Sequence, residues 1–137
     1  MEAMTLHSPT ATLLVVDDEP LMTDLFSQYM SRLGYRILVA CSGEQALEII
    51  ASELTPIHVV VSDLNMHGMD GLTLAKKLFK IAPSLSVILT TGIDCKSEIE
   101  SLPPNIVCFL QKPYQNRILA EKIAGILVAF DTCPDCV

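Results

Sequence analysis

Short apolar runs alternate along the chain with longer segments whose apolar residues recur every three or four positions. The short runs lie at 12–16, 36–40, 57–61, 85–89 and 106–110. Runs of this length that stay apolar at successive positions are typical of parallel strands covered on both faces. The pattern therefore predicts an α/β fold in which five strands form a doubly wound parallel sheet with helices on both sides.

The segments between the first three runs carry the signals of helix starts and ends. Pro20 is placed to open a first helix and Gly34 to stop it. Ser42 and Gln45 fit a capping box that starts a second helix. Both helices are predicted to be amphipathic. The side chains predicted to face the core are Met22, Leu25, Phe26, Tyr29, Met30 and Leu33 in the first helix, and Ala46, Leu47, Ile49 and Ile50 in the second.

Three further helical segments follow the later strands. One ends before Pro83, a short and weakly patterned one lies at 94–101, and the last is predicted over 114–130. The inward residues are Leu72, Ala75, Leu78 and Phe79 in the first of these helices, and Ile118, Leu119, Ile123, Ile126 and Leu127 in the last. No repeat or internal linker interrupts the pattern. We therefore expect one domain over 11–130, between an N-terminal tail at 1–10 and a C-terminal tail at 131–137.

Length and charge narrow the class of protein. The chain has 137 residues, which is enough for one sizeable core, and half of them are hydrophobic. Its formal charge is −7 with only nine basic residues, which argues against a nucleic-acid-binding surface. No apolar stretch approaches the length of a membrane span, and the N-terminus does not resemble a signal peptide. We therefore expect a cytoplasmic protein without a membrane segment.

Two cysteines near the C-terminus, Cys133 and Cys136, have C-x-x-C spacing. This spacing occurs in redox sites and in halves of zinc sites. A structural zinc site needs about four ligands, and no second Cys or His pair with suitable spacing is present. We therefore interpret these residues as reduced thiols in a tail.

Polar residues with distinct chemistry follow four of the predicted strands: Asp17 and Asp18, then Asp63, then Thr91, then Lys112. In a doubly wound sheet, ligands bind beyond the carboxyl ends of the strands, so these side chains are expected to converge. Three carboxylates in one crevice repel one another, and a hard divalent cation such as Mg²⁺ would neutralise them. Carboxylates, a cation, a lysine and a hydroxyl suit phosphoryl transfer, with one carboxylate as the nucleophile that forms an acyl phosphate.

Each of these residues also has a plain structural interpretation. Acidic residues such as Asp17 and Asp18 are favourable at a helix N-terminus, and Asp63 is a common turn residue. Thr91 suits the end of a strand, and Lys112 could be a solvated lysine before a proline. Taken singly, these interpretations are at least as good as a functional one. Their joint occurrence at four strand ends favours the functional interpretation.

The motifs that carry these residues are LLVVDDEP, VVSDLNMHGMDG, VILTTG and FLQKPY, in this order. With them the chain resembles the receiver domains of two-component response regulators, from about residue 12 to 130. The resemblance implies a flavodoxin-like (βα)5 fold with strand order 2-1-3-4-5. It also implies that Asp63 accepts a phosphoryl group. Asp18, Asp63 and the backbone carbonyl of Asn65 would bind Mg²⁺, with Asp17 nearby and acting through a water molecule.

The resemblance assigns roles to four more residues. Lys112 would contact the phosphoryl group, and Thr91 would move toward it. Phe109 would change rotamer as an aromatic switch, and the peptide bond between Lys112 and Pro113 would be cis. The implied phosphodonor is a sensor histidine kinase or a histidine phosphotransfer domain. The switched surface would be formed by the fourth and fifth βα units, around 96–122, where an effector or a second copy could bind.

The sequence departs from the family pattern at His67, where many members have proline; a special role for this histidine is not assigned. The strongest competing class is a phosphatase with an aspartyl nucleophile, which usually has a second Asp two residues after the first. Here that residue is Asn65, which favours a phosphate-holding switch over a turnover enzyme. A degenerate module that is never phosphorylated is a further alternative. The form FLQKPY also resembles receivers attached to hybrid sensor kinases.

Overall fold

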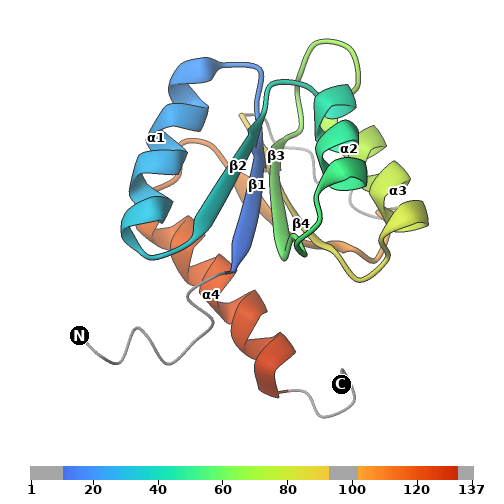
Figure 1. The fold of residues 1–137 in the computed structure, drawn as a ribbon. Helices are drawn as coiled ribbons and strands as arrows, with labels where there is room; N and C mark the ends of the chain where they lie inside the picture. Colours follow the sequence, from blue (N-terminus) through green and yellow to red (C-terminus); the bar gives the residue numbers. More distant parts are fainter. Residues whose placement is uncertain (1–10, 93–101, 133–137) are drawn as a thin grey trace.

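A computed structural model describes residues 11–92 and 102–132 of the chain. Within these residues the elements are β1 (Thr12–Val16), α1 (Pro20–Arg32), β2 (Arg36–Ala40), α2 (Gly43–Ser52), β3 (Val59–Asp63), α3 (Gly71–Ile81), β4 (Ser86–Thr91), β5 (Ile106–Gln111) and α4 (Asn116–Thr132). The strands form one sheet in the order β2-β1-β3-β4-β5, and every pairing is parallel (Figure 1). The predicted fold class and strand order are confirmed.

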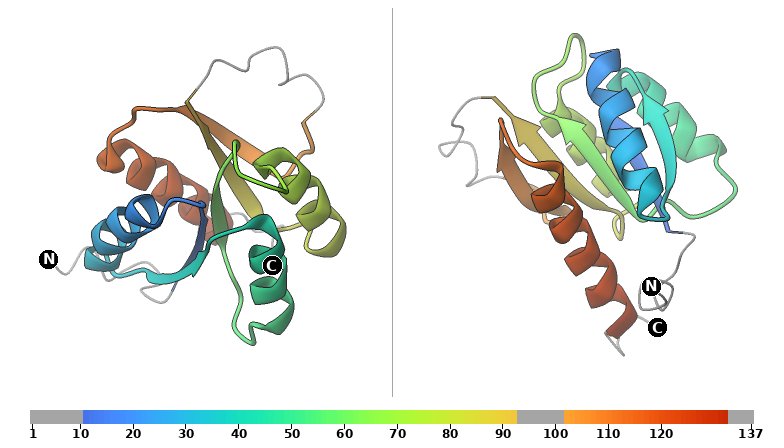
Figure 2. Two further views of the ribbon diagram at one scale, coloured as in Figure 1. Left: turned by 90° about the horizontal axis from the view of Figure 1, so that it is seen from above. Right: turned by 90° about the vertical axis from the view of Figure 1, so that its left-hand side faces the viewer.

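The sheet separates two layers of helices. α1 and α4 cover one face, and α2 and α3 cover the other (Figure 2). Alternate residues of β1 divide between the two cores, with Leu14 and Val16 facing α2 and α3, and Leu13 and Val15 facing α1 and α4. All four side chains are buried, which explains why the strand is apolar at successive positions.

The third strand lies two residues later than predicted, so the predicted bounds 57–61 were wrong. β3 extends through Ser62 and Asp63 because its ladder with β4 continues there, pairing Asp63 with Thr90. The N–H of Leu64 also donates to the carbonyl of Thr90 at 2.7 Å. Polar residues normally mark the end of a strand, but here the neighbouring strand satisfies their backbone groups.

Helix positions also differ in places from the periodicity. Leu25, Leu33 and Phe79 were predicted to face the core, but all three are exposed. The last helix begins at Asn116 and not at residue 114, because Gln115 supplies the carbonyl that accepts from the N–H groups of Ile118 and Leu119. The predicted helix at 94–101 and the Cys133–Cys136 pair lie outside the described residues.

Local residue choices explain where α2 and α3 begin. The hydroxyl of Ser42 accepts from the N–H of Gln45 at 3.0 Å, as the predicted capping box requires. The reciprocal bond goes to Cys41, whose N–H donates to the side chain of Gln45 at 2.6 Å. At α3, the Asp70 carboxylate accepts from the N–H of Thr73 at 2.7 Å. No helix in the described parts of the chain is long and apolar enough to cross a membrane.

Candidate functional site

Asp63 lies at the carboxyl end of the central strand β3, where the chain turns into the loop that leads to α3. The residue is buried, with 8% of its surface exposed. The first residue of α3, Gly71, lies directly over the strand end, and its N–H donates to the carbonyl of Leu64 at 2.9 Å. The strand and the helix therefore fix the backbone that carries the Asp63 carboxylate.

Two further carboxylates come from the end of β1. One oxygen each of Asp17, Asp18 and Asp63 lies within 4.8 Å of the other two. Two of these carboxylates also accept hydrogen bonds from nearby backbone groups. Asp17 accepts from the N–H of Glu19 at 3.0 Å, and Asp63 accepts from the N–H of Asn65 at 3.3 Å. The parallel sheet thus brings together the three acidic residues that the sequence placed at strand ends.

Lys112 brings a positive charge to this cluster from the end of β5. Its Nζ lies 3.4 Å from an oxygen of Asp63 and 3.9 Å from an oxygen of Asp17. The N–H of Lys112 donates to the carbonyl of Thr91 at 2.6 Å, which ties this residue to the end of β4. The peptide bond between Lys112 and Pro113 is cis.

The electrostatics of Asp17 reflect the crowding of charge. Burial raises the pKa of Asp17 above its ordinary value, and repulsion by the Asp63 carboxylate adds to the effect. The N–H of Glu19 and the ammonium of Lys112 partly offset this rise in the pKa of Asp17. Lys112 therefore only partly offsets the effects of burial and of the neighbouring carboxylate on Asp17.

Asp18 has a partner that the sequence did not predict. One of its oxygens accepts from the backbone N–H of His67 at 3.0 Å and lies 2.9 Å from Nδ1 of the His67 ring. These contacts lower the pKa of the Asp18 carboxyl below its ordinary value. His67 was the residue of the loop to which the sequence assigned no role, and only its departure from the family pattern could have drawn attention to it.

The two residues expected to act as switches occupy neighbouring strands. Thr91 is the last residue of β4 and is buried. Phe109 is a half-buried residue of β5, placed opposite Leu89, and it packs against the core on the α2–α3 side of the sheet. Both therefore lie on the strands next to the acidic cluster.

A hollow of about 560 Å³ opens beside Lys112, between α1 and the start of α4. Its lining residues are Met22, Leu25, Phe26, Gly92, Lys112, Pro113, Tyr114 and Asn116. Leu21 and Leu25 on α1 are exposed by 68% and 48%. Burial raises the pKa of Tyr114, and the charges of Asp17 and Asp63 add to the rise. The sequence missed this hollow because Leu25 had been assigned to the core.

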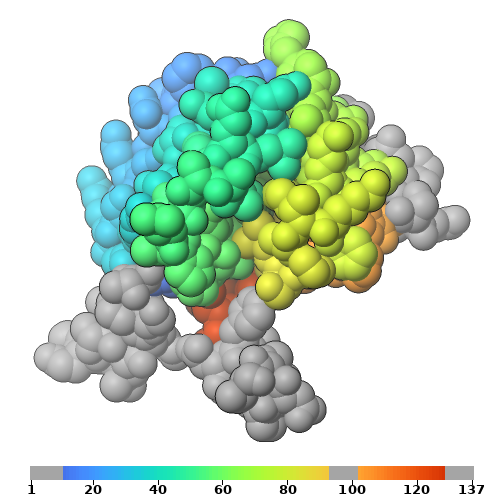
Figure 3. Space-filling view, turned by 45° about the vertical axis from the view of Figure 1, so that its right-hand side comes forward, coloured from blue at the N-terminus to red at the C-terminus, as the bar shows by residue number. Residues whose placement is uncertain are grey.

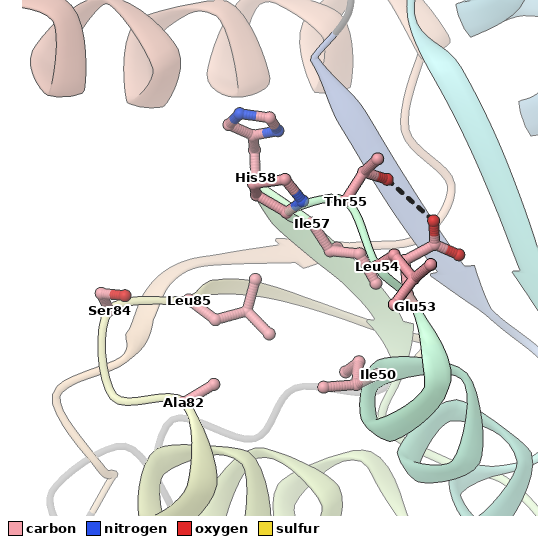
Figure 4. A pocket seen from close by; sticks show the side chains of 10 residues that line it. Ile50, Glu53, Leu54, Thr55, Ile57, His58, Ala82, Ser84 and Leu85 are labelled. Atoms are coloured by element: carbon pink, nitrogen blue, oxygen red, sulfur yellow. Dashed lines mark hydrogen bonds between the residues drawn. The ribbon is translucent and has the colours of Figure 1, made fainter.

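A second hollow of about 420 Å³ lies at the opposite end of the sheet, between the end of α2 and the segment that follows α3. Figure 4 shows Ile50, Leu54, Ala82 and Leu85 around it, with a hydrogen bond between Thr55 and Glu53 at its rim. Its walls are largely apolar, and none of the strand-end carboxylates lines it. It is therefore separate from the acidic cluster.

The donor set at the carboxyl edge is suited to a hard divalent cation. Its three ligand candidates are all carboxylates, and oxygen ligands of this kind are preferred by Mg²⁺ and Ca²⁺. Burial, with a smaller contribution from the Asp63 carboxylate, raises the pKa of Asp17, and a cation bound at the cluster would favour the charged form of this group. Mg²⁺ is usually held by only one or two carboxylates together with waters and phosphate oxygens. The cluster offers three carboxylates, so one or two of them can bind the ion directly.

Comparison with known proteins gives consistent relatives. The sequence matches the model of the response regulator receiver domain over residues 13–124. The transcriptional regulatory protein GlrR of Escherichia coli K12 is 31% identical over 88% of this chain and 27% of its own length. The sensor kinase CckA of Brucella abortus is 33% identical over 93% of this chain and 14% of its own length. The chain thus spans less than a third of these curated relatives.

Solved structures agree in fold. A response regulator receiver domain protein of Clostridium thermocellum has a TM-score of 0.81 and 26% identity, covering 88% of this chain and 97% of that one. The response regulator TrrA of Thermotoga maritima, solved in complex with Mg²⁺ and BeF, has a TM-score of 0.77 and 29% identity over 86% of this chain and all of that one. This chain therefore belongs to the response regulator receiver domain family.

Proposed function

We propose that Asp63 accepts a phosphoryl group in a Mg²⁺-dependent reaction from a phosphohistidine of a sensor histidine kinase or a histidine phosphotransfer domain. The observation that carries this proposal is the ammonium of Lys112, 3.4 Å from an Asp63 oxygen, beside three carboxylates that approach within 4.8 Å. Phosphoryl transfer depends mainly on positioning and on stabilisation of charge, and this site supplies both.

In the proposed step, a carboxylate oxygen of Asp63 attacks the phosphorus as the bond from phosphorus to the donor imidazole breaks. The bonding electrons leave with the imidazole, which already carries a proton on its other nitrogen and departs neutral. Asp18, Asp63 and the backbone carbonyl of Asn65 would hold Mg²⁺, with Asp17 acting through a water molecule. When bound, the cation supplies compensation for the charge on the phosphoryl oxygens. Lys112 contacts the same oxygens.

The hollow beside Lys112 supports a protein as the phosphodonor. Leu25 exposes apolar surface on α1 and lines this hollow together with Met22, Lys112 and Tyr114. Exposed apolar surface beside a reactive group is typical of a site where another protein docks. A small phosphodonor would not need this surface, whereas a helical partner would cover it.

The proposed output begins at the strands that flank the acceptor. Phosphorylation replaces the single charge of the Asp63 carboxylate with a phosphoryl group of about −1.5 to −2, which the Thr91 hydroxyl would approach as the Phe109 ring turns inward. Both residues lie on β4 and β5. β5 is an edge strand with Val107 exposed by 50%. We therefore place the switched surface on the described part of the fourth and fifth units, 102–122, as a site for an effector or a second copy.

The relatives of this chain indicate two settings in which such a receiver occurs. The similarity to the sensor kinase CckA supports a receiver of the hybrid-kinase type, which passes its phosphoryl group onward. The similarity to GlrR supports a receiver attached to a transcriptional regulator. The low number of basic residues describes this module only, so a DNA-binding partner domain is compatible with it.

The proposal is tested by incubating the purified chain with acetyl phosphate and Mg²⁺ and measuring its intact mass. We expect the mass of one phosphoryl group to be added to the wild type and to be absent after Asp63→Asn. Asp70→Asn is the matched control, because Asp70 lies in the same loop but caps α3 and stands outside the carboxylate cluster. This variant should gain the same mass as the wild type.

Other outcomes would favour the competing classes. Release of inorganic phosphate over many turnovers, without a stable phosphorylated form, would indicate an aspartyl phosphatase. An unchanged mass together with a lack of Mg²⁺ binding would indicate a degenerate module. A mass gain that persists in Asp63→Asn would show that another residue is the acceptor.

A further inference from the structure

His67 lies in the loop between β3 and α3, which stands out at the top of the molecule beside the start of α2 (Figure 3). Gly68 follows it with a φ of 77°, a left-handed conformation that glycine adopts readily. Met69 then returns to the core, and its side chain lies against Gly43 at the start of α2. The loop is thus anchored behind His67, while the His67 ring itself is exposed.

The two contacts of His67 with Asp18 converge on one carboxylate oxygen. The backbone N–H donates to this oxygen at 3.0 Å, and Nδ1 of the ring lies 2.9 Å from the same oxygen. A carboxylate oxygen accepts and does not donate, so a hydrogen bond at this distance requires the ring proton to be on Nδ1. His67 therefore links the loop after Asp63 to the end of β1, 49 residues away in the sequence.

Asp18 is the carboxylate of the cluster that most needs such a partner. Lys112 forms ion pairs with Asp17 and Asp63 but, among the contacts of the described residues, not with Asp18. The Asp18 side chain is 23% exposed, compared with 8% for Asp17 and 9% for Asp63. Repulsion by two buried carboxylates favours rotation of Asp18 toward solvent, and its bonds to His67 oppose that rotation.

We infer that His67 is a positioning residue for the cation site, because it holds the Asp18 carboxylate within reach of Asp17 and Asp63. The inference rests on the proposed function, in which these carboxylates bind Mg²⁺. Without His67, binding the cation would first require Asp18 to be brought back against the repulsion of its neighbours. A chain with proline at residue 67 could not form this arrangement, because proline has neither the N–H nor the ring donor.

The test compares Mg²⁺ affinity, measured by isothermal titration calorimetry, in the wild type and in three variants of His67. His67→Ala loses the ring contact and should bind Mg²⁺ about threefold more weakly, whereas His67→Pro loses both contacts and should bind about tenfold more weakly. His67→Asn keeps an N–H donor near the place of Nδ1 and should restore affinity close to that of the wild type. Unfolding by urea without Mg²⁺ should be nearly unchanged by His67→Ala.

A second readout needs no metal. ¹⁵N-detected NMR of the imidazole, at a pH where the ring is neutral, should show the proton of His67 on Nδ1. In Asp18→Ala the ring should return to the form with its proton on Nε2, which free histidine prefers. A wild-type ring with the proton on Nε2 would contradict the inference.

The outcomes separate this inference from the proposed function. If the wild type binds no Mg²⁺ and takes no phosphoryl group, the proposed function fails. If the wild type does both and all three His67 variants bind Mg²⁺ equally well, the proposed function stands and the positioning role of His67 is overturned.

Discussion

Replacement of Gly71 by alanine should disturb both the stability of the protein and the position of the proposed phosphoacceptor. Gly71 is the first residue of α3 and lies directly over the end of β3. A Cβ at this position would lie 2.5 Å from the carbonyl oxygen of Asp63, 3.0 Å from Cα of Leu64 and 3.1 Å from the carbonyl carbon of Asp63. All three are backbone atoms, so no side-chain rotation relieves the contact.

The sign of the effect follows from two opposing contributions to the free energy of unfolding. Alanine is favoured over glycine by up to about 1 kcal/mol inside a helix, and by less at its first position. Overpacking against a rigid neighbour typically costs about 1–3 kcal/mol. We therefore expect Gly71→Ala to lower the free energy of unfolding by about 2 kcal/mol, because the clash outweighs the gain in helix propensity.

Two other glycines provide matched controls. A Cβ on Gly125, in α4, would meet no atom within 4 Å, so Gly125→Ala should raise stability by about 0.5–1 kcal/mol. A Cβ on Gly43 would lie 2.8 Å from the sulfur of Met69, which is the far part of a flexible side chain. The free energy of unfolding of Gly43→Ala should therefore lie between those of Gly71→Ala and Gly125→Ala. Urea denaturation of all three ranks them directly.

The same substitution predicts a functional effect, because the crowded atoms belong to Asp63 and Leu64. A shift of a few tenths of an ångström at the strand end changes the distance between the carboxylate and Lys112, and should slow phosphorylation about fivefold per folded molecule. The rate is measured by intact mass over time, under conditions where each variant is folded. If Gly71→Ala were as stable as Gly125→Ala, the packing argument would be refuted. Lost stability with an unchanged rate would show that α3 moves and the strand end does not.

Two further predictions concern charge. Lys112→Gln should slow phosphorylation about 10²-fold, because the positive charge that faces the transferring group is lost. Lys76→Gln, at an exposed position on α3, is the control and should leave the rate of mass gain unchanged. Equal rates in the two variants would contradict the role of Lys112. Burial raises the pKa of Tyr114, so the stability that its neutral form contributes is present below about pH 10 and is lost as the pH rises above that value. Urea denaturation across this pH range should show a smaller loss of stability in Tyr114→Phe than in the wild type. Identical losses in the two proteins would argue against a contribution from Tyr114.

The strands were predictable where a single physical cause sets their bounds. β1 and β2 have the predicted bounds because each consists of apolar residues after a single polar one, Thr12 in β1 and Arg36 in β2. The end of β3 was not predictable in this way. Ser62 and Asp63 are polar and their strand character comes from pairing with β4, which lies more than 20 residues further along the chain. Local residue type therefore predicts which residues of a parallel strand are buried, while pairing with the neighbouring strand determines where the hydrogen-bond ladder ends.

Helix faces were less predictable than helix positions. Leu25 in α1 and Leu33, the residue directly after this helix, continue the spacing of the inward stripe, yet both are exposed. Thr23 is buried in their place, with its hydroxyl donating to the carbonyl of Pro20 at 2.9 Å. A polar residue that satisfies its own hydroxyl within the helix can face the core, and periodicity scored on apolar residues alone does not detect it.

The site, like the fold, was predictable from residue type only in part. The convergence of Asp17, Asp63 and Lys112 follows from the rule that parallel strands end at one edge, so residue type and strand order were sufficient to predict it. The contact of His67 with Asp18 depends on the path of a loop through Gly68, which residue type does not determine. A loop that crosses from one strand end to another creates contacts that only the three-dimensional structure shows.

The charge of the cluster links the proposed chemistry to the proposed switch. Asp17, Asp18, Asp63 and Lys112 together carry a formal charge of −2, and the raised pKa of Asp17 is the local consequence of burying this excess. A divalent cation would remove it. A phosphoryl group on Asp63 would then exchange the single charge of the carboxylate for about −1.5 to −2, which restores a net excess of about −0.5 to −1. The new charge would sit further out than the carboxylate it replaces, so groups at the ends of β4 and β5 would have to move to compensate it. Thr91 and Lys112 are already joined there by a backbone hydrogen bond of 2.6 Å, so movement of one strand end would be transmitted to the other.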